Sequence, residues 1–239
     1  MPVVGGVVMG FLNPPRIDFE FAIGRANHPW IARTVVQAAQ EAIAGMLVLP
    51  NQIACPIADR EQLDRLCPGL MQGWQSAEAR GVLRVTLIKA RNLKASDCNC
   101  LKPWEHTSDP YVELKLGTEL WMSSVKRRTV NPEWDLDKDP LGCCHDFMVF
   151  DKEQKLFTRI FDKDRCSKDD FLHLARPIRV CDAIRNPTQW LDLFDDDELG
   201  EDDVGGKCGA SQPQIQVKFD WLKLRPSEEE RTGTSHWSN

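Results

Sequence analysis

Aspartates gather at two places in the chain where one predicted β-strand gives way to the next. Asp97 and Asp109 form the first group, and Asp162, Asp164 and Asp170 form the second. Carboxylates held close together repel one another, so a fold keeps them only where a cation resolves the repulsion or where they splay into water. Hard divalent cations such as Ca²⁺ bind clusters of carboxylate and carbonyl oxygens. The pattern therefore predicts a calcium site that draws on two loops.

The spacing within the second group separates candidate ligands from their neighbours. One residue lies between Asp162 and Asp164, which puts both carboxylates on the same side of an extended backbone. Asp169 directly precedes Asp170 and is expected to point away, so it is left out of the site. The alternative is that all of these aspartates are solvated loop residues in a domain that works without calcium.

Half-buried β-strands are predicted on both sides of the first group. Apolar and polar residues alternate in 83–87 and 112–116, and the same period returns in 215–221. Turn residues separate these short strands. The pattern indicates a mainly β, antiparallel sandwich. The acidic run at 195–203 is predicted to be an insertion between the last two strands, on the side of the aspartates.

Three motifs occur in an order that is found in a known family. They are SDPYV at 108–112, VNPEWD at 130–135 and FDKDRCSKDD at 161–170. Together with GVLRVTLIKARNLKASD from Gly81, they resemble the C2 domain, a family of eight-stranded calcium- and phospholipid-binding β-sandwiches. The resemblance implies a set of Ca²⁺ ligands that consists of Asp97, Asp109, Asp162, Asp164, Asp170 and Ser167.

The same resemblance implies that the loop tips touch a membrane. Cys98 and Cys166 stand where many C2 domains carry inserting apolar residues, and Leu101 and Trp104 extend the first loop. A Trp ring suits a membrane interface because it is apolar while its N–H can stay wet. The alternative is that Trp104 packs back onto the sandwich. The expected partners are anionic phospholipid membranes, bound once Ca²⁺ offsets the negative charge of the loops.

Residues 1–57 carry a second resemblance. GFLNPPRIDFEF, an apolar stripe at helical spacing in 31–46, and MLVLPNQIACPI look like the end of the synaptotagmin-like mitochondrial-lipid-binding (SMP) domain of extended synaptotagmins. The other interpretation of the stripe is a helix that packs on a sheet. We expect a small α+β segment at 1–57, a linker at 58–80, a C2 domain at 81–225 and a disordered tail at 226–239. The resemblance also implies a homodimer through the SMP-like segment.

Composition excludes several classes of function. The net charge of −6 argues against a nucleic-acid partner. Nucleophile elbows, zinc-protease motifs and dinucleotide fingerprints are missing from the sequence, so an enzyme is not expected. The longest apolar stretch falls short of the roughly 18 residues that span a bilayer, so membrane contact of this chain is expected to be peripheral. The nine cysteines lack the spacing of a secreted disulfide scaffold and fit the reducing cytosol.

These features lead to two functional hypotheses. The resemblance to extended synaptotagmins implies calcium-dependent phospholipid binding, in membrane tethering and lipid transfer at contacts between endoplasmic reticulum and plasma membrane. The alternative is a calcium-independent scaffold that binds proteins through the faces of the sandwich. A zinc site from Cys143, Cys144 and His145 with Cys98 and Cys100 is disfavoured because paired CxxC spacing is absent. The five histidines are scattered and are expected to be solvated or structural.

Overall fold

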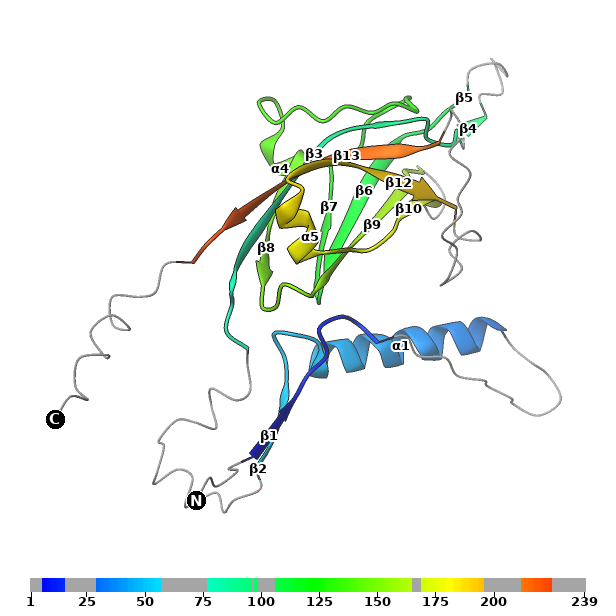
Figure 1. The fold of residues 1–239 in the computed structure, drawn as a ribbon. Helices are drawn as coiled ribbons and strands as arrows, with labels where there is room; N and C mark the ends of the chain where they lie inside the picture. The colour runs from blue at the N-terminus through cyan, green and yellow to red at the C-terminus, as the bar shows by residue number, and fades with distance from the viewer. Residues whose placement is uncertain are drawn as a thin grey trace.

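The fold is a β-sandwich with a small α+β unit below it (Figure 1). The computed structural model describes residues 6–15, 29–56, 77–95, 97–98, 106–164, 169–195 and 212–224. The predicted tail at 226–239 and most of the predicted linker at 58–80 lie outside these residues. None of the helices in the described segments combines the length and apolar character that crossing a bilayer requires.

Eight strands form the sandwich in the order β7-β6-β9-β10-β12-β13-β3-β8, and all neighbours are antiparallel. The predicted mainly β, eight-stranded antiparallel sandwich is therefore confirmed. In chain order the strands are β3 (Gly81–Arg91), β6 (Pro110–Leu116), β7 (Glu119–Met122), β8 (Cys144–Val149), β9 (Lys155–Asp162), β10 (Asp170–Ala175), β12 (Thr188–Phe194) and β13 (Gln214–Leu222). Short β11 (Ile178–Arg179) adds to β9, and β4 (Asp97–Cys98) pairs with β5 (His106–Thr107).

Alternation along the strands places one set of side chains in the core. Leu83, Val85 and Leu87 of β3 are at most 1% exposed, as the period-two pattern predicts. The VNPEWD motif runs back along β3: the N–H of Trp134 donates to the carbonyl of Ile88 at 2.8 Å, and its ring is buried. The tight turn between β6 and β7 requires a left-handed backbone, which Gly117 supplies at φ 60°.

Side-chain contacts connect β7 and β8, the first and last strands in this order. His145 of β8 lies 2.8 Å from the carboxylate of Glu119 and stacks on Trp121, with ring centroids 5.6 Å apart. The ring of Phe147 meets the same imidazole edge to face at 4.6 Å. These contacts bring the two ends of the sheet together, so the core between them is enclosed.

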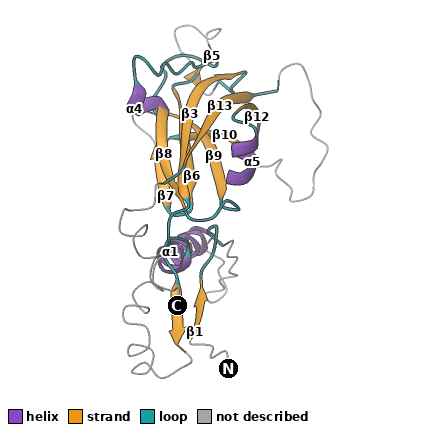
Figure 2. Cartoon of the chain, turned by 60° about the vertical axis from the view of Figure 1, so that its left-hand side comes forward, coloured by secondary structure: helices purple, strands orange, loops and turns teal. Residues whose placement is uncertain are grey.

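The N-terminal unit contains β1 (Gly6–Met9), α1 (Pro29–Leu47) and β2 (Ile53–Pro56), and β1 pairs with β2 antiparallel. The predicted helix is present. Its apolar stripe is only partly covered, since Val35 is 37% and Met46 60% exposed. The helix lies beneath the sandwich in both views (Figure 2). Val48, just after the helix, is fully buried.

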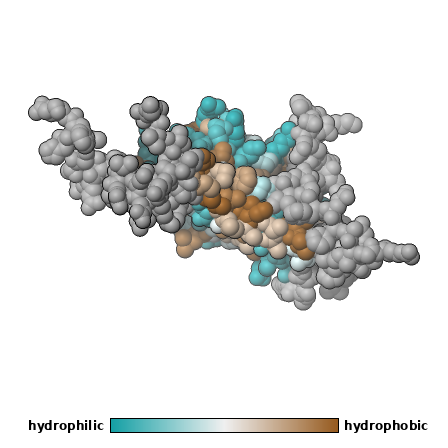
Figure 3. Space-filling model, turned by 90° about the horizontal axis from the view of Figure 1, so that it is seen from below, coloured by the Kyte–Doolittle hydropathy of each residue, from teal (hydrophilic) through white to brown (hydrophobic). Residues whose placement is uncertain are grey.

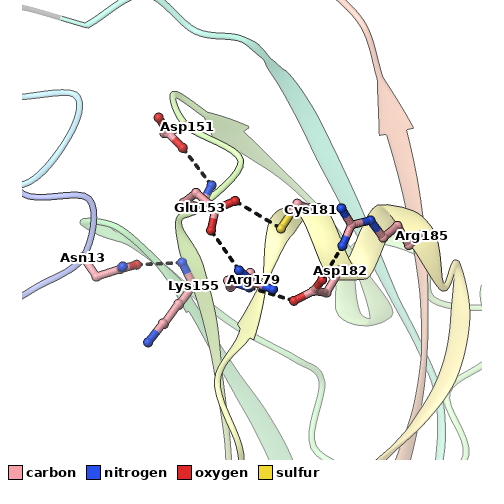
Figure 4. A network of polar contacts seen from close by, with 8 residues as sticks. All are labelled: Asn13, Asp151, Glu153, Lys155, Arg179, Cys181, Asp182 and Arg185. Carbon is pink, nitrogen blue, oxygen red and sulfur yellow. Dashed lines mark hydrogen bonds and ion pairs between the residues drawn. The ribbon is translucent and has the colours of Figure 1, made fainter.

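A hydrogen bond joins the lower end of the sandwich to this unit, and a polar network within the sandwich lies beside it (Figure 4). The side-chain oxygen of Asn13 accepts a hydrogen bond of 2.6 Å from the N–H of Lys155, the first residue of β9. Arg179 bridges Glu153 at 3.2 Å and Asp182 at 2.8 Å, and Asp182 lies in α5 (Val180–Arg185). Because Lys155 begins β9 and Asp162 ends it, the contact with Asn13 is at the opposite end of this strand from Asp162.

A short helix, α4 (Pro140–Cys143), precedes β8.

The core makes a direct prediction for stability. Phe147 is 0% exposed, so Phe147→Ala leaves a cavity and should lower the free energy of unfolding by about 3–5 kcal/mol in urea denaturation. The matched control is Met148→Ala, because Met148 follows in the same strand and is 43% exposed. It should change stability by less than about 1 kcal/mol. Equal losses in the two variants would contradict the assigned core.

Candidate metal centre

The strand register brings the acidic residues of distant segments to one end of the sandwich. Asp162, the last residue of β9, pairs with Pro110 of β6 on one side and with Asp170 of β10 on the other. Asp109 directly precedes Pro110, and Asp164 follows Asp162 by two residues. Four of the five predicted carboxylates therefore come from neighbouring backbone positions at the ends of three adjacent strands.

Asp162 is the most constrained of these groups. It is 1% exposed, and its Oδ1 accepts a hydrogen bond of 2.6 Å from the N–H of Asp109. Its Oδ2 is also buried and has no hydrogen-bond partner among the described residues. Buried polar atoms are nearly always paired, so an unpaired carboxylate oxygen at this position indicates a place for a further partner.

Asp109 links the SDPYV motif to the loop that follows β7. Its Oδ1 accepts a hydrogen bond of 2.7 Å from the N–H of Arg128, a residue in the left-handed region at φ 56°. Its backbone carbonyl accepts the N–H of Lys163 at 3.0 Å. The Asp109 and Asp162 segments are thus tied in both directions, and Arg128 adds a third segment.

The first loop also reaches this end of the molecule. Asp97 in β4 pairs with Thr107 of β5, two residues before Asp109. The buried hydroxyl of Ser108 donates to the carbonyl of Lys94 at 2.9 Å, which joins the start of the loop to the SDPYV motif. The backbone of Asp97 is therefore at the same end as Asp162, while its side chain is outside what the structure describes.

Asp169, directly before β10, bonds to the residues that follow β9, although its place next to Asp170 predicted that it points away from the site. Its Oδ1 accepts the N–H of Asp164 at 3.2 Å. Its Oδ2 accepts both the hydroxyl of Tyr111 and the ammonium of Lys163, each at 2.9 Å. The ion pair with Lys163 is the main reason that the pKa of Asp169 lies below its usual value. Nothing in the local sequence indicated this role, because Tyr111 lies 58 residues earlier.

The same contact changes the phenol of Tyr111. Burial is the largest cause that raises its pKa, and the hydrogen bond to Asp169 adds to it. The ring stacks on Phe161 with centroids 5.7 Å apart, and Phe161 meets Phe171 edge to face at 5.8 Å. This aromatic row lies across β6, β9 and β10 next to the acidic end, so it stiffens the strands that carry the carboxylates.

The described side chains alone do not form a closed metal cage. Within the described segments, no group of three or more His, Cys, Asp or Glu side chains gathers as a metal site would. Ser167 and the expected membrane contacts Leu101, Trp104 and Cys166 lie outside the described residues, as does the side chain of Cys98. The chemistry of the donors fits Ca²⁺, because carboxylate and carbonyl oxygens are its preferred ligands and the buried Oδ2 of Asp162 has no partner in the part of the chain that the structure describes.

The thiols give less support to a zinc site. Cys143 is buried, and burial raises the pKa of its thiol. Metal binding to cysteine uses the thiolate, so a raised pKa works against it. The adjacent Cys144 accepts a hydrogen bond from the hydroxyl of Thr86 at 3.4 Å. Cys143 is thus a core residue at the end of α4, and Cys144 is the first residue of β8.

Comparison with known proteins identifies the sandwich. The sequence of residues 81–193 matches the C2 domain family. This segment is a C2 domain. The matched residues lie inside the predicted range 81–225, and β13 completes the C2 sheet beyond them. The boundaries of the predicted linker and tail stay predictions.

The whole chain resembles extended synaptotagmins, as predicted. It is 27% identical to rat extended synaptotagmin-1, in a match that covers 100% of this chain and 20% of the relative. It is 28% identical to human extended synaptotagmin-1, in a match that covers 100% of this chain and 19% of the relative. The chain thus spans about a fifth of the length of these relatives. A solved structure of two C2 domains of extended synaptotagmin 2 with calcium bound is 25% identical, with a TM-score of 0.47, and the match covers 63% of this chain and 48% of that one. The assignment of residues 1–57 to an SMP domain stays a prediction.

The role of Asp169 can be tested through the pH dependence of stability. Tyr111→Phe removes one hydrogen bond to a carboxylate and should lower the free energy of unfolding by about 1–2 kcal/mol at pH 7. The folded-state pKa of Asp169 lies below its unfolded value of about 3.9. The stabilisation is therefore complete above the unfolded pKa and is lost as pH falls through the folded one. Urea denaturation of both proteins between pH 7 and pH 3 measures the difference.

Asp169→Asn serves as the control background. In that background the carboxylate is absent at every pH, so Tyr111→Phe should have a smaller effect with little pH dependence. A loss that stays constant from pH 7 to pH 3 in the otherwise native protein would show that Tyr111 acts through packing alone.

Proposed function

We propose that the chain is a calcium-dependent phospholipid-binding module that serves membrane tethering and lipid transfer at contacts between endoplasmic reticulum and plasma membrane. It would act as a peripheral membrane protein on the cytoplasmic side. One observation carries the calcium part of the proposal. Asp162 is buried among the converging strand ends, and one of its carboxylate oxygens has no partner among the described residues. The tethering and transfer parts rest on the resemblance to extended synaptotagmins.

The residues proposed to hold Ca²⁺ are the five aspartates and one serine that the motifs single out, namely Asp97, Asp109, Asp162, Asp164, Asp170 and Ser167. Bound Ca²⁺ supplies positive charge and coordination positions that lipid phosphate oxygens can complete. The hydrogen bond from the N–H of Asp109 keeps Oδ1 of Asp162 in place. Asp169 orders the backbone of Asp164 in the same way. The proposed site is thus prearranged by bonds from neighbouring segments.

Charge explains why binding would depend on calcium. The cluster would concentrate five of the formal negative charges at one end of a chain whose net charge is −6, so an anionic membrane repels that end. Neutralising the carboxylates removes the repulsion and lets the loop tips approach. The proposed contacts there are Cys98, Leu101, Trp104 and Cys166. Membrane recruitment would then be an electrostatic switch with little change of fold.

The arrangement of the two parts suits a tether. Lys155 at the lower end of β9 binds Asn13 of the N-terminal unit, whereas Asp162 at the upper end belongs to the proposed membrane-binding loops. The N-terminal unit would therefore lie on the side of the C2 domain that faces away from the bound membrane (Figure 1). The length of β9 would separate it from that surface.

A calcium-independent protein-interaction scaffold is the second candidate. Leu120 and Met122 on β7 are 48% and 54% exposed, which leaves apolar side chains on an outer surface of the sandwich. Exposed apolar surface of this kind is a feature of protein interaction sites. In this case the aspartates would be solvated loop residues, and lipid binding would not respond to Ca²⁺.

Calorimetric titration with Ca²⁺ distinguishes the two candidates. The native protein should bind Ca²⁺ with a dissociation constant of roughly 10⁻⁷ to 10⁻⁵ M, or more weakly when lipid is absent. The double variant Asp162→Asn and Asp164→Asn should lose this heat, because two charged ligands are removed. It should also fail to co-sediment with phosphatidylserine-containing liposomes in the presence of Ca²⁺.

Asp220→Asn is the matched control. Asp220 lies in the middle of a strand pair, opposite Arg84, and its substitution should leave the titration unchanged. If the native protein gives no heat with or without anionic liposomes, the scaffold is favoured. If Asp220→Asn loses calcium binding as completely as the double variant does, the effect belongs to net charge and the site assignment is wrong.

We also propose that the N-terminal unit pairs with a second copy of the chain. Apolar side chains form a band on the face seen from below (Figure 3). Eight large apolar residues of the unit are 37–60% exposed, namely Val7, Val8, Met9, Phe11, Leu12, Val35, Met46 and Ile53. A concentration of this kind on so small a unit is typical of a surface that another polypeptide covers. The homodimer implied by the SMP resemblance would use this face.

The dimer can be tested by sedimentation equilibrium. The double variant Met9→Glu and Met46→Glu puts charges on the two most exposed of these residues and should weaken self-association at least about tenfold. Leu141→Glu is the matched control, since Leu141 is 87% exposed on α4 of the C2 domain. A native protein that stays monomeric at micromolar concentration, or a control that dissociates equally, would overturn the proposal.

A further inference from the structure

The buried imidazole of His173 lies between the start of the first loop and Asp195, the first residue of the acidic run at 195–203. His173 of β10 has a side chain that is only 5% exposed, three residues after Asp170. A register shift between Phe171 and His173 interrupts the pairing of β10 with β9 at this point. Such a bulge re-aims the side chains that follow it. The role of this residue is not contained in the family motifs, which end at Asp170.

One ring nitrogen of His173 holds the start of the first loop. Nε2 accepts a hydrogen bond of 2.9 Å from the N–H of Lys94. The preceding N–H groups, of Asn92 and Leu93, are bonded to the side chain of Asn131 and the carbonyl of Val130. Lys94 is therefore the last of three successive backbone anchors before the chain reaches Asp97.

The other ring nitrogen faces a carboxylate. Nδ1 lies 3.1 Å from Oδ1 of Asp195, whose side chain is 54% exposed. This approach is close enough for an ion pair, but it lacks the alignment of a hydrogen bond, and Nδ1 has no aligned partner among the described residues. Asp195 is the first residue of the acidic run at 195–203. The imidazole thus touches the first loop on one side and the end of β12 on the other.

The contact with Lys94 fixes the tautomer of the ring. A backbone N–H can donate only to an unprotonated nitrogen, so the proton of the neutral imidazole must be on Nδ1, toward Asp195. A proton taken from solvent onto Nε2 would turn that acceptor into a donor. Two N–H groups would then face each other at 2.9 Å, and the anchor of Lys94 would be lost.

We propose that His173 is a positioning residue, which holds the first loop ready for calcium while its imidazole is neutral and releases the loop when it is protonated. The inference rests on the proposed calcium function. Protonation of His173, which is not itself a proposed ligand, would weaken Ca²⁺ binding. Asp97 is the ligand whose position it controls, because the released anchor is three residues before it.

Electrostatics of the surroundings supports the switch. Burial is the largest influence on His173 and lowers its pKa, and the charge of Lys94 acts in the same direction. Asp195 acts in the opposite direction and is the charged group that favours the imidazolium. Because the folded-state pKa lies below about 6.5, the neutral form is the one that the fold stabilises. That stability is lost as pH falls below the unfolded pKa toward the folded one.

The test compares two substitutions of His173. Gln places an oxygen acceptor near the position of Nε2 but does not titrate, whereas Ala removes the acceptor. Calcium affinity is measured by calorimetry at pH 7.4 and pH 5.5, above the usual range of carboxylate titration. The native protein should lose roughly three- to ten-fold in affinity at pH 5.5, and His173→Gln should lose less than about two-fold.

Two more variants sharpen the comparison. His173→Ala should bind weakly at both pH values, and Asp195→Asn should shift the affinity loss to lower pH because it removes the group that favours the imidazolium. If His173→Ala does not fold, His173→Gln still decides the question. A His173→Gln protein that keeps the native pH dependence would overturn the proposal, as would an Asp195→Asn protein whose loss moves to higher pH. His145→Gln is the control, since His145 lies in β8 against Glu119 and Trp121 of β7, away from the first loop, and it should keep the native profile.

Amide hydrogen exchange separates this inference from the calcium proposal. Without Ca²⁺, and after correction for intrinsic rates, protection of the Lys94 amide should fall about tenfold between pH 7.4 and 5.5 in the native protein. In His173→Gln it should stay constant. Unchanged protection in the native protein would overturn the switch even if Ca²⁺ binds. A protection change without any calcium binding would retain the proton-released anchor and reject the calcium function.

Discussion

The pairing of β9 with β6 on one side and β10 on the other determines where the acidic residues meet. The register sets Pro110, Asp162 and Asp170 side by side, and the side chain of Asp162 then accepts the N–H of Asp109. A shift by one residue would turn Asp162 from the interior to the outer face and break this bond. The buried apolar residues that alternate with the outward ones in β9 oppose such a shift. Packing of the core and placement of the carboxylates are therefore one constraint.

The loops around this end are held by polar contacts that come from other segments. Asp169 ties the start of β10 to β6 through Tyr111, Ser108 ties the SDPYV motif to Lys94, and His173 ties Lys94 to β10. Each of these side chains is at least partly buried, so its bonds are less exposed to competition from water. The acidic end is thus organised by residues that are not themselves proposed ligands.

Local patterns were enough to predict the sandwich and the neighbourhood of the aspartates. Alternation in 83–87 marks a strand with one buried face wherever it occurs, and β3 buries Leu83, Val85 and Leu87 as expected. The importance of Asp169 and His173 could not be read in this way. Their partners, Tyr111 and Lys94, are 58 and 79 residues away, and only the folded chain brings them together.

The helix of the N-terminal unit shows a different limit. Its apolar spacing predicted a helix correctly, but period alone does not tell whether the stripe will be covered within the same chain. The outer part of that stripe, with Met46, is exposed. Likewise, the short pairing of β4 with β5 has no signal in the sequence, because two-residue strands are too short to show a period.

The position of β3 has a mechanical consequence. Gly81 begins this strand on the side of the N-terminal unit, and the chain leaves its other end toward Asp97. The strand is bonded along its length to β13, over nine residue pairs, and to β8, over six. A pull between the N-terminal unit and the acidic loops would load these ladders in shear, so that many hydrogen bonds share the force at once. A hairpin opened from its end would yield one bond at a time.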